Sequence, residues 1–448
     1  MRAFLITFTA LAIYPQTSRD ATEVLAHTRD NMIERTKRLL DYTCVQTVDR
    51  RYYVRSKPEE PRPTCDQMSA EARKKSYTLR LTATDRLHLD IKVSGGTEIG
   101  SWAGANRFDS RSILDLLGGG PFGTGPFGPL LQDVFVNGGT TFRYVGEEQG
   151  NNPALFHYRF QVPVEASHFL VRNGDARDWT ATSYDGELWI DPDSFDLRRI
   201  SVRTSELSPE TNACETAMIA DYAPVRFQTG DFLIPQHSVF HILMRDTQET
   251  EITYSYSSCR EYRGESTLSF ADAPTKSATE ATTPRVPKSL PAGLSVTLAF
   301  TAPIDTDTAA AGDVVEAKVR KAVRDPRSKE VLIPAGVTVQ GRIIEMRHWV
   351  AKPAYFLIAI LLETVDINGV SSPFYAQLDR PDEYMDEQRT KSGFHPPGVA
   401  IILPPAGRST SVGSFVFRST NRRYVVPSNY ESSWTTIPPP NQGTPPSR

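Results

Sequence analysis

Several features that mark large classes of proteins are scarce in this 448-residue sequence. It holds only 4 cysteines, and its 50 Lys and Arg residues nearly balance its 53 Asp and Glu residues, which leaves a formal net charge of −3. Because affinity for phosphate backbones needs a basic surface, this balance argues against a protein that binds nucleic acid along its whole length. No apolar run reaches the roughly 18–20 residues of a membrane-spanning helix, so no transmembrane helix is predicted.

The composition itself is that of a folded protein. Hydrophobic residues make up 39% and charged residues 23% of the chain, which is near the values of globular domains. At about 150 residues per domain, the length predicts two or three domains.

The common sequence signatures of catalysis and cofactor binding are also missing. The chain contains no GxSxG, no HExxH and no P-loop pattern, so we predict no catalytic residue, no metal ligand and no cofactor. Residues 118–128 match GxGxxG twice, but a dinucleotide site needs a strand before the glycines and a helix after them, and this context is absent. The repeated Pro-Phe-Gly predicts instead a loop whose Phe122 and Phe127 contact a ligand or a partner. An irregular surface loop is the alternative.

Two pairs of residues require a choice between a site and ordinary structure. His237 and His241 have the spacing of a metal pair on a helix, but on a strand they would lie about 13 Å apart, too far to hold one ion. The flanking sequence predicts a strand and therefore no metal site. Asp191 and Asp193 could act as paired carboxylates in glycoside hydrolysis. They stand, however, in a turn-like sequence, where Asp side chains bond the local backbone.

The N-terminus indicates export. Met1-Arg2 is followed by twelve mostly apolar residues, a pattern typical of a secretory signal peptide, which we predict over residues 1–18. A buried N-terminal helix is the alternative. Export would place the protein in the periplasm or outside the cell.

An oxidising compartment would allow the four cysteines to form disulfides. We expect pairing between cysteines that are close in sequence, Cys44 with Cys65 and Cys214 with Cys259, although four cysteines allow three pairings. A metal site built from all four would need a CxxC-like spacing, which the chain lacks.

Alternation of apolar and polar residues predicts a mainly β fold in two parts. A helix capped by Asp20 begins the first part, 19–270, which we predict to be a curved antiparallel half-barrel with further helical segments near 112–117 and 129–135. A linker rich in Ala, Thr and Pro follows at 271–289. The second part, 290–436, is predicted to be a small β-barrel with a hairpin at Asn368-Gly369, and 437–448 a disordered Pro-rich tail.

Aromatic residues are frequent in the first part. They are Trp102, Phe142, Tyr144, Phe156, Tyr158, Phe160, Trp179 and Trp189. A hollow curved sheet would use such side chains to hold an acyl chain or another apolar ligand, whereas a filled sheet would bury them in its core. The sequence leaves both alternatives open.

One segment of the first part is characteristic. Residues 187–200 read ELWIDPDSFDLRRI and follow a helix and a long antiparallel run of strands. The first part thereby resembles the periplasmic lipoprotein-carrier (LolA-like) fold, in which a W-I-D-P…L-x-R hairpin is typical and a half-barrel wraps one face of helical segments. The resemblance implies the fold. The cysteine pairs and residues 161–168 also resemble exported acidobacterial proteins, a group that implies no activity.

The second part carries the segments 290–293 (LPAG), 311–317 (AGDVVEA) and 332–342 (LIPAGVTVQGR). They resemble the C-terminal β-barrel of the outer-membrane-core subunit of type IV secretion and conjugation machines (TrbI-like). In that family, (I/L)-P-x-G turns introduce strands, because Pro presets φ and Gly permits the turn. The resemblance implies a barrel module in the cell envelope.

These observations predict an exported, non-enzymatic protein of the cell envelope. Its half-barrel would bind a lipid, another apolar ligand or a partner protein, and its small barrel would serve as a scaffold or docking module. Two other functions stay open. A hydrolase of envelope polymers would need two carboxylates that face each other across a cleft, and a structural subunit would form a large assembly.

Overall fold

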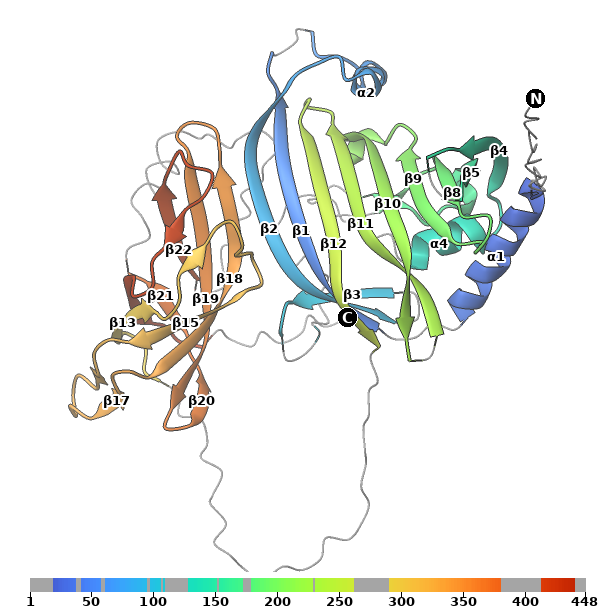
Figure 1. Cartoon of the computed structure of the whole chain (residues 1–448). Coiled ribbons are helices and arrows are strands. Elements are labelled where there is room, and N and C mark those ends of the chain that lie inside the picture. The colour runs from blue at the N-terminus through green and yellow to red at the C-terminus, as the bar shows by residue number, and fades with distance from the viewer. Residues whose placement is uncertain are drawn as a thin grey trace, which may run out of the picture.

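A computed structural model describes residues 19–37, 42–57, 61–94, 97–105, 108, 128–150, 153–171, 179–228, 230–261, 290–379 and 412–439. The predicted signal peptide, the predicted helical segment near 112–117, the predicted linker 271–289 and residues 440–448 of the predicted tail lie outside these ranges, and the domain boundaries stay a prediction. The protein is 57% strand and 12% helix, with a large antiparallel sheet that does not close. The predicted fold class, mainly β with a curved half-barrel, is therefore confirmed (Figure 1).

The N-terminal module, residues 19–261, is built on one curved antiparallel sheet. Its strands follow the order β4–β5–β8–β9–β10–β11–β12–β1–β2–β3, so that the first strand of the module pairs with its last. The bounds are β1 Tyr42–Arg55, β2 Leu79–Ser94, β3 Thr97–Trp102, β4 Thr141–Glu148, β5 Leu155–Val162, β8 Tyr184–Ile190, β9 Leu197–Thr204, β10 Ala213–Phe227, β11 Gly230–Met244 and β12 Glu249–Glu261. The short strands β6 Leu170–Val171 and β7 Thr180–Ala181 form a separate pair, and the 3-10 turns are Val164–Ala166 and Pro209–Thr211.

Two helices pack into the core of this sheet. Helix α1 (Ala21–Lys37) begins after Asp20, whose carboxylate accepts a hydrogen bond from the backbone N–H of Thr22 at 2.8 Å; the predicted cap is confirmed. Helix α4 (Gly128–Phe135) confirms the helical segment predicted near 129–135, and it lies against α1. Val24 of α1 and Phe135 of α4 are fully buried among the inward-facing strand residues. The helices are therefore part of the core of the half-barrel.

The C-terminal module, residues 290–439, curls its strands around a second core. The order is β22–β19–β18–β15–β13–β24–β21. The bounds are β13 Ser295–Phe300, β14 Ile304–Asp305, β15 Val314–Val319, β16 Val323–Arg324, β17 Val331–Ile333, β18 Thr338–Trp349, β19 Tyr355–Ile367, β20 Val370–Pro373, β21 Ala376–Leu378, β22 Val412–Arg418, β23 Val425–Val426 and β24 Glu431–Thr436. Asn368 and Gly369 both have positive φ and join β19 to β20, so the predicted hairpin is confirmed.

The two modules share one sheet, which the sequence did not predict. The end of β18 pairs with β2, so that Arg347 lies opposite Asp85 and Trp349 opposite Ala83. In addition, the backbone of Ala311 bonds that of Arg86 at 2.9 Å and that of His88 at 2.7 Å. Figure 1 shows the C-terminal module standing directly beside β2. A ladder of backbone hydrogen bonds therefore links the modules.

A buried group of charges lies at this junction. Asp85 bonds Arg50 through two contacts of 2.6 and 3.1 Å, accepts a hydrogen bond from Tyr52 at 2.9 Å, and lies 3.6 Å from Arg347 of the other module. Arg50, Asp85 and Arg347 are each less than 10% exposed. One carboxylate thus lies between cations from both modules, and Arg347 also pairs with Glu345 at 3.4 Å. Removing the charge of Asp85 would take the nearest carboxylate from a buried arginine, which is costly.

The disulfides differ from the expected pairing. The structure joins Cys44 to Cys259 and Cys65 to Cys214, and no cysteine is left free. The expectation of sequence-local pairs is wrong because the fold brings distant segments together. Cys44 and Cys259 stand on β1 and β12, which are neighbours in the sheet, with Cα atoms 4.0 Å apart.

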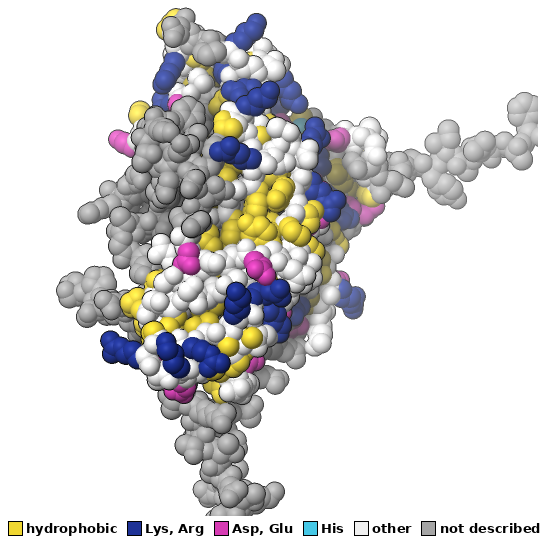
Figure 2. Space-filling model, turned by 90° about the vertical axis from the view of Figure 1, so that its left-hand side faces the viewer, with side chains coloured by type: hydrophobic (Ala, Val, Ile, Leu, Met, Phe, Trp, Pro, Cys, Tyr) yellow, Lys and Arg dark blue, Asp and Glu magenta, His cyan; other side chains and the backbone are white. Residues whose placement is uncertain are grey.

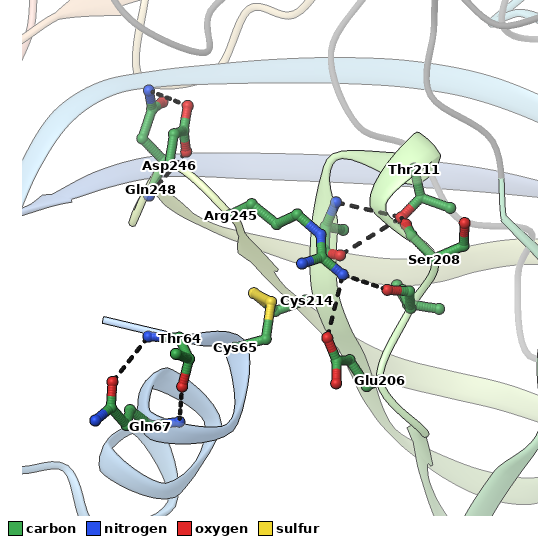
Figure 3. Close-up of a disulfide and its surroundings, with 12 residues drawn as sticks. Thr64, Cys65, Gln67, Glu206, Ser208, Thr211, Cys214, Arg245, Asp246 and Gln248 are labelled. Atoms are coloured by element: carbon green, nitrogen blue, oxygen red, sulfur yellow. Dashed lines mark hydrogen bonds and ion pairs between the residues drawn. A yellow bond between two sulfur atoms is a disulfide. The ribbon is translucent and has the colours of Figure 1, made fainter. Parts of the chain in front are cut away.

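The second disulfide attaches a helix that the sequence reading missed. Helix α2 (Cys65–Lys74) begins with a capping box, in which Thr64 accepts a hydrogen bond from the N–H of Gln67 and the Gln67 side chain accepts one from the N–H of Thr64 (Figure 3). Cys65 then bonds Cys214 of β10, and this small cluster also buries Met68. The helix is thereby held against β10, which lies three strands along the sheet from β1, the strand that precedes the helix.

Candidate functional site

A cavity of about 580 Å³ lies in the C-terminal module between β22 and β24. Its lining consists of Ser414, Phe415, Val416 and Phe417 from β22, Tyr430, Glu431, Ser432 and Ser433 at β24, and Leu378 and Asp379 at the end of β21. Side chains on a strand alternate between two faces. A cavity that meets four consecutive residues of each strand is therefore lined by the strand edges themselves. We call this cavity the seam slot.

The seam slot lies where two strands of the C-terminal module, β22 and β24, are not joined by a described ladder of backbone hydrogen bonds. β22 pairs with β19 along its whole length, from Tyr355 opposite Arg418 to Leu361 opposite Val412. On its other edge, Ser414–Phe417 form no backbone hydrogen bond with any described residue. β24 pairs with β13 on one edge. Its other edge is covered by β21 at residues 434–436 and by the N–H of Asp379, which bonds the carbonyl of Ser433 at 3.0 Å. Among the described residues, β22 and β24 form no ladder with each other.

One end of the slot is closed by a tryptophan. The indole ring of Trp434 crosses from β24 to β22 and lies against Gly413, where an added Cβ would stand 2.1 Å from the ring. Only glycine permits this approach. Trp434 is 1% exposed and packs edge-on against Phe415 with a centroid distance of 6.2 Å.

Aromatic rings form one wall of the slot. Phe415 and Phe417, two residues apart on one face of β22, stack with centroids 6.3 Å apart. Tyr430 meets both rings edge-on at 6.0 and 5.8 Å, and Tyr424 stacks on Phe417 at 4.8 Å. These rings continue the core of the module, so the slot offers an apolar surface that is already ordered.

The two charged residues of the lining are both acidic. Asp379 and Glu431 are exposed and stand on the β21–β24 side. Asp379 accepts a hydrogen bond from Thr435, and Glu431 pairs with Arg320 at 2.8 Å. Figure 2 shows hydrophobic side chains gathered at the centre of the face that carries the C-terminal module, with acidic and basic side chains around them. The lining itself is apolar at Phe415, Val416 and Phe417 of β22 and acidic at Asp379 and Glu431.

The sequence-predicted loop residues Phe122 and Phe127 lie outside the described residues. Of the aromatic residues singled out in the first part, Phe156, Tyr158 and Phe160 are buried in the core of the N-terminal module. Trp179, by contrast, is 50% exposed. The described aromatic side chains of the half-barrel thus include core residues and surface residues.

The two candidate pairs occupy the structures predicted for them. His237 and His241 stand on strand β11, and His241 bonds the buried Glu249 at 2.8 Å. Asp191 begins a turn in which its carboxylate accepts hydrogen bonds from the N–H groups of Asp193 and Ser194. Among the described residues, no group of three His, Cys, Asp or Glu side chains could hold a metal ion.

An oriented imidazole lies elsewhere in the N-terminal module. The buried Asp133 accepts hydrogen bonds at 2.7 Å from both the Nδ1 and the backbone N–H of His168, and the His168 side chain is 70% exposed. The other groups that Asp133 bonds are Asn137 and Tyr184. Burial, and next the charge of Asp133, raise the pKa of Tyr184. The pair therefore orients a histidine, but no nucleophile stands among these described partners.

The sequence reading missed the residues that form the slot. Phe415 and Phe417 lie on β22 and Trp434 on β24, within the part predicted only as a small β-barrel. Two signals were available: the alternation of Phe415 and Phe417, and Gly413 inside a strand, which often marks close approach of another group. Neither signal indicates that the facing strand edge stays unpaired.

Comparisons with known proteins give resemblances of fold at low similarity. No protein-family model matches the chain, and no curated protein matches it significantly. Among solved structures, a domain from Vibrio parahaemolyticus described as an outer membrane lipoprotein-sorting protein is 11% identical with a TM-score of 0.26, and it covers 55% of this chain and 95% of its own.

Two further solved structures resemble parts of the chain. A DUF1329 family protein from Desulfovibrio piger is 9% identical over 55% of this chain and 96% of its own, with a TM-score of 0.24. ComB10 of the Com type IV secretion system of Helicobacter pylori is 13% identical over 34% of this chain and 92% of its own, with a TM-score of 0.17. These structures represent the two kinds of fold that the sequence resembles, the lipoprotein-carrier fold for the first part and the secretion-system barrel for the second.

Proposed function

We propose that this protein is an exported, non-enzymatic docking protein of the cell envelope that holds a partner in the seam slot. The observation that carries the proposal is the slot itself. Its volume of about 580 Å³ falls within the range of specific binding sites. Its wall is aromatic and ordered, and its two acidic residues stand on one side and already have partners.

The disulfides support export. Both bonds join segments of the N-terminal module that are distant in sequence, by 215 and 149 residues. Such structural disulfides persist in oxidising compartments and are rare in the cytosol. No described helix has the length and apolar character needed to cross a membrane.

We assign the binding to the C-terminal module because the described core of the half-barrel is packed. Leu188, Ile190 and Ile200 of the sheet are fully buried in one cluster that also contains Val24 of α1 and Phe135 of α4. The N-terminal module then acts as a rigid support, joined to the docking module through β2 and β18.

A site-specific photo-crosslink tests this function in cells that produce the protein. A benzophenone side chain replaces Phe417 in the slot or, as a matched control, Val331, which is 39% exposed on the same module. We expect a discrete adduct with one exported protein from position 417 and none from position 331. Equal adducts at both positions, or an adduct with lipid alone, would contradict a docking function.

A further inference from the structure

We infer that the C-terminal module attaches the protein to an anionic membrane surface through a hairpin of basic residues beside the seam slot. The hairpin comprises residues 318–330, and its cations are Lys318, Arg320, Lys321, Arg324, Arg327 and Lys329. We call it the basic hairpin. The inference rests on the proposed location in the cell envelope and goes beyond the docking function, because it names a second surface and the chemistry that this surface binds.

Positive charge is concentrated in the basic hairpin although the chain as a whole is slightly acidic. Six of its 13 residues are Lys or Arg and two are acidic, whereas the whole chain has a net charge of −3. All six cationic residues are exposed. One of the two acids, Asp325, accepts hydrogen bonds from the N–H groups of Arg327 and Ser328 at 2.7 and 2.8 Å. Its carboxylate is therefore used inside the turn, and the hairpin presents an excess of positive charge to solvent.

The cations of the basic hairpin have few carboxylate partners. Among the described residues, only Arg320 of these six forms an ion pair, with Glu431 at 2.8 Å. Lys318 donates instead to the uncharged hydroxyl of Thr338 at 2.7 Å. Exposed arginines of the N-terminal sheet lie within 3.1 Å of a carboxylate, as in Arg51 with Glu251, Arg159 with Glu187 and Arg199 with Asp221. The hairpin thus keeps available the kind of charge that these arginines neutralise internally.

The backbone of the basic hairpin is ordered by strand pairing and by its turn. Val323 of β16 pairs with Ile333 of β17, and both side chains are buried in the core of the C-terminal module. In the turn, the N–H of Lys329 donates to the carbonyl of Asp325 at 3.0 Å, and the N–H of Asp325 donates to the carbonyl of Glu330 at 2.9 Å. A segment that is already ordered loses little conformational entropy on binding, which favours attachment.

The place of the hairpin in the fold leaves it free to meet a flat surface. Figure 1 shows β17 at the outer end of the C-terminal module, on the side away from the N-terminal module. The hairpin also begins beside the seam slot, because Arg320 pairs with Glu431 of the slot lining. A protein attached through this end would hold the slot close to the membrane and the N-terminal module away from it.

The residues between the cations favour a lipid surface over a folded partner. Apart from the cations, the exposed residues of 318–330, all of which the structure describes, are Ala322, Pro326, Ser328 and Glu330. Protein interfaces are depleted of charge at their core, and aromatic anchors supply much of their energy. This stretch contains no aromatic residue. Anionic lipid headgroups, by contrast, can gather beneath cations that are spread over strands and a turn.

Vesicle flotation tests the inference on the full, disulfide-bonded chain. The vesicles consist of phosphatidylcholine alone or of phosphatidylcholine mixed with phosphatidylglycerol, which carries a negative charge. We expect binding to the anionic vesicles at low salt and at least tenfold weaker binding to the neutral vesicles. Raising the salt concentration should weaken binding to the anionic vesicles, because salt screens the attraction between exposed charges.

Variants of the basic hairpin locate the binding. The triple variant Lys321→Gln, Arg327→Gln, Lys329→Asn should weaken binding to the anionic vesicles about 100-fold, because each Lys or Arg near an anionic surface strengthens binding about fivefold. The single variant Arg327→Gln should weaken it about fivefold. The three side chains are exposed, so guanidinium should unfold the triple variant at the same midpoint as the wild type.

A second triple variant with the same loss of charge is the matched control. Arg143→Gln, Arg159→Gln, Arg226→Gln removes three exposed cations of the N-terminal module. Binding to the anionic vesicles should stay within twofold of the wild type, because these residues lie outside the module that carries the basic hairpin. Equal weakening by the two triple variants would show that net charge alone governs the binding, and the hairpin would have no special role.

The remaining outcomes identify a different anion. Equal binding to neutral and anionic vesicles, or binding to neither, overturns the inference. A fluorescent peptide of eight Glu residues that binds the wild type more tightly than the anionic vesicles do would indicate an acidic protein segment as the partner. Release from the vesicles by inorganic phosphate at constant ionic strength would indicate a site for a small anion. Both results would overturn the inference, whereas the protein adduct at position 417 tests the seam slot separately.

Discussion

The two modules differ in whether an edge strand carries charges and a bulge that discourage pairing. β4 forms an edge of the N-terminal sheet, and it carries exposed Arg143, Glu147 and Glu148 and a bulge between Tyr144 and Gly146. Charges and a bulge discourage another strand from pairing there. β22 has neither along the residues that line the slot. Within the described residues, the two modules therefore differ in how far an edge strand is protected against pairing.

The modules also differ in what holds them together. The N-terminal module ties its first strand to its last with Cys44–Cys259 and fixes α2 with Cys65–Cys214. The C-terminal module, by contrast, contains no cysteine. Its described strands β22 and β24 form no ladder with each other, and the rings of Trp434 and Tyr430 pack across the seam against Phe415. Disulfides thus crosslink one module, whereas side-chain packing alone joins these two strands of the other.

The largest expected effect comes from removing a disulfide of the N-terminal module. Replacing both cysteines of one disulfide by Ser should lower the free energy of unfolding by about 2–5 kcal/mol, because the unfolded chain regains the freedom of a long loop. Guanidinium unfolding measures this loss. Reductant should lower the free energy of unfolding of the wild type at least as much, because it breaks both disulfides, and should not change that of a variant that lacks all four cysteines.

The pairing itself has a direct check. In Cys44→Ser, alkylation without reductant followed by peptide mapping should label Cys259 and leave Cys65 and Cys214 unlabelled. A label on Cys65 would indicate that Cys44 normally pairs with Cys65, as the sequence alone suggested, and would contradict the pairing in the structure.

A second large effect would uncouple the modules. Asp85→Asn breaks the buried pair of Asp85 with Arg50 and leaves Arg347 with Glu345 as its carboxylate neighbour, and breaking a buried pair in this way costs about 3–5 kcal/mol. The matched control is Asp49→Asn on the neighbouring strand. Asp49 pairs with Arg86 at 2.6 Å, but both side chains are about a third exposed, so the loss there should be about 1 kcal/mol or less.

The junction prediction also specifies how unfolding should change. Asp85→Asn should split one cooperative transition into two if the shared ladder and its buried charges couple the modules. Equal effects of Asp85→Asn and Asp49→Asn on the free energy of unfolding would show that the buried position of Asp85 gives it no special role.

Local signals in the sequence were sufficient to predict helices and strands, but not which of these elements pair or pack together. Asp20 and the period-two alternation of strands such as β5 predicted a helix start and a sheet, because capping and amphipathic alternation act over a few residues. The capping box at Thr64 and Gln67 was equally local. It was missed because the surrounding charged, Pro-rich sequence resembles a loop.

Contacts between distant segments could not be predicted in this way. Cys44 meets Cys259 only because the last strand of the half-barrel returns to the first. The junction of β2 with β18 joins residues more than 250 positions apart. The slot is harder still, because it follows from a ladder that does not form between β22 and β24, and no local pattern records an absent pairing.

The smallest expected effect concerns pH at the junction. His348 of β18 lies opposite Thr84 of β2 and stacks on Phe356 with ring centroids 4.0 Å apart, and its Nε2 is buried without a hydrogen-bond partner. Burial lowers the pKa of His348 from its ordinary value of 6.5. Below pH 6.5 the unfolded chain therefore binds this proton more readily than the folded chain, so stability should fall as the pH falls.

His348→Phe keeps the ring stack and removes the titration. Unfolding measured from pH 7.5 to pH 5 should show a smaller loss of stability in His348→Phe than in the wild type, with the difference confined to the region below pH 6.5. His237→Phe, at an exposed position of β11, is the control for the loss of an imidazole. If both variants lose stability with pH as the wild type does, protonation of His348 does not weaken the contact between the modules.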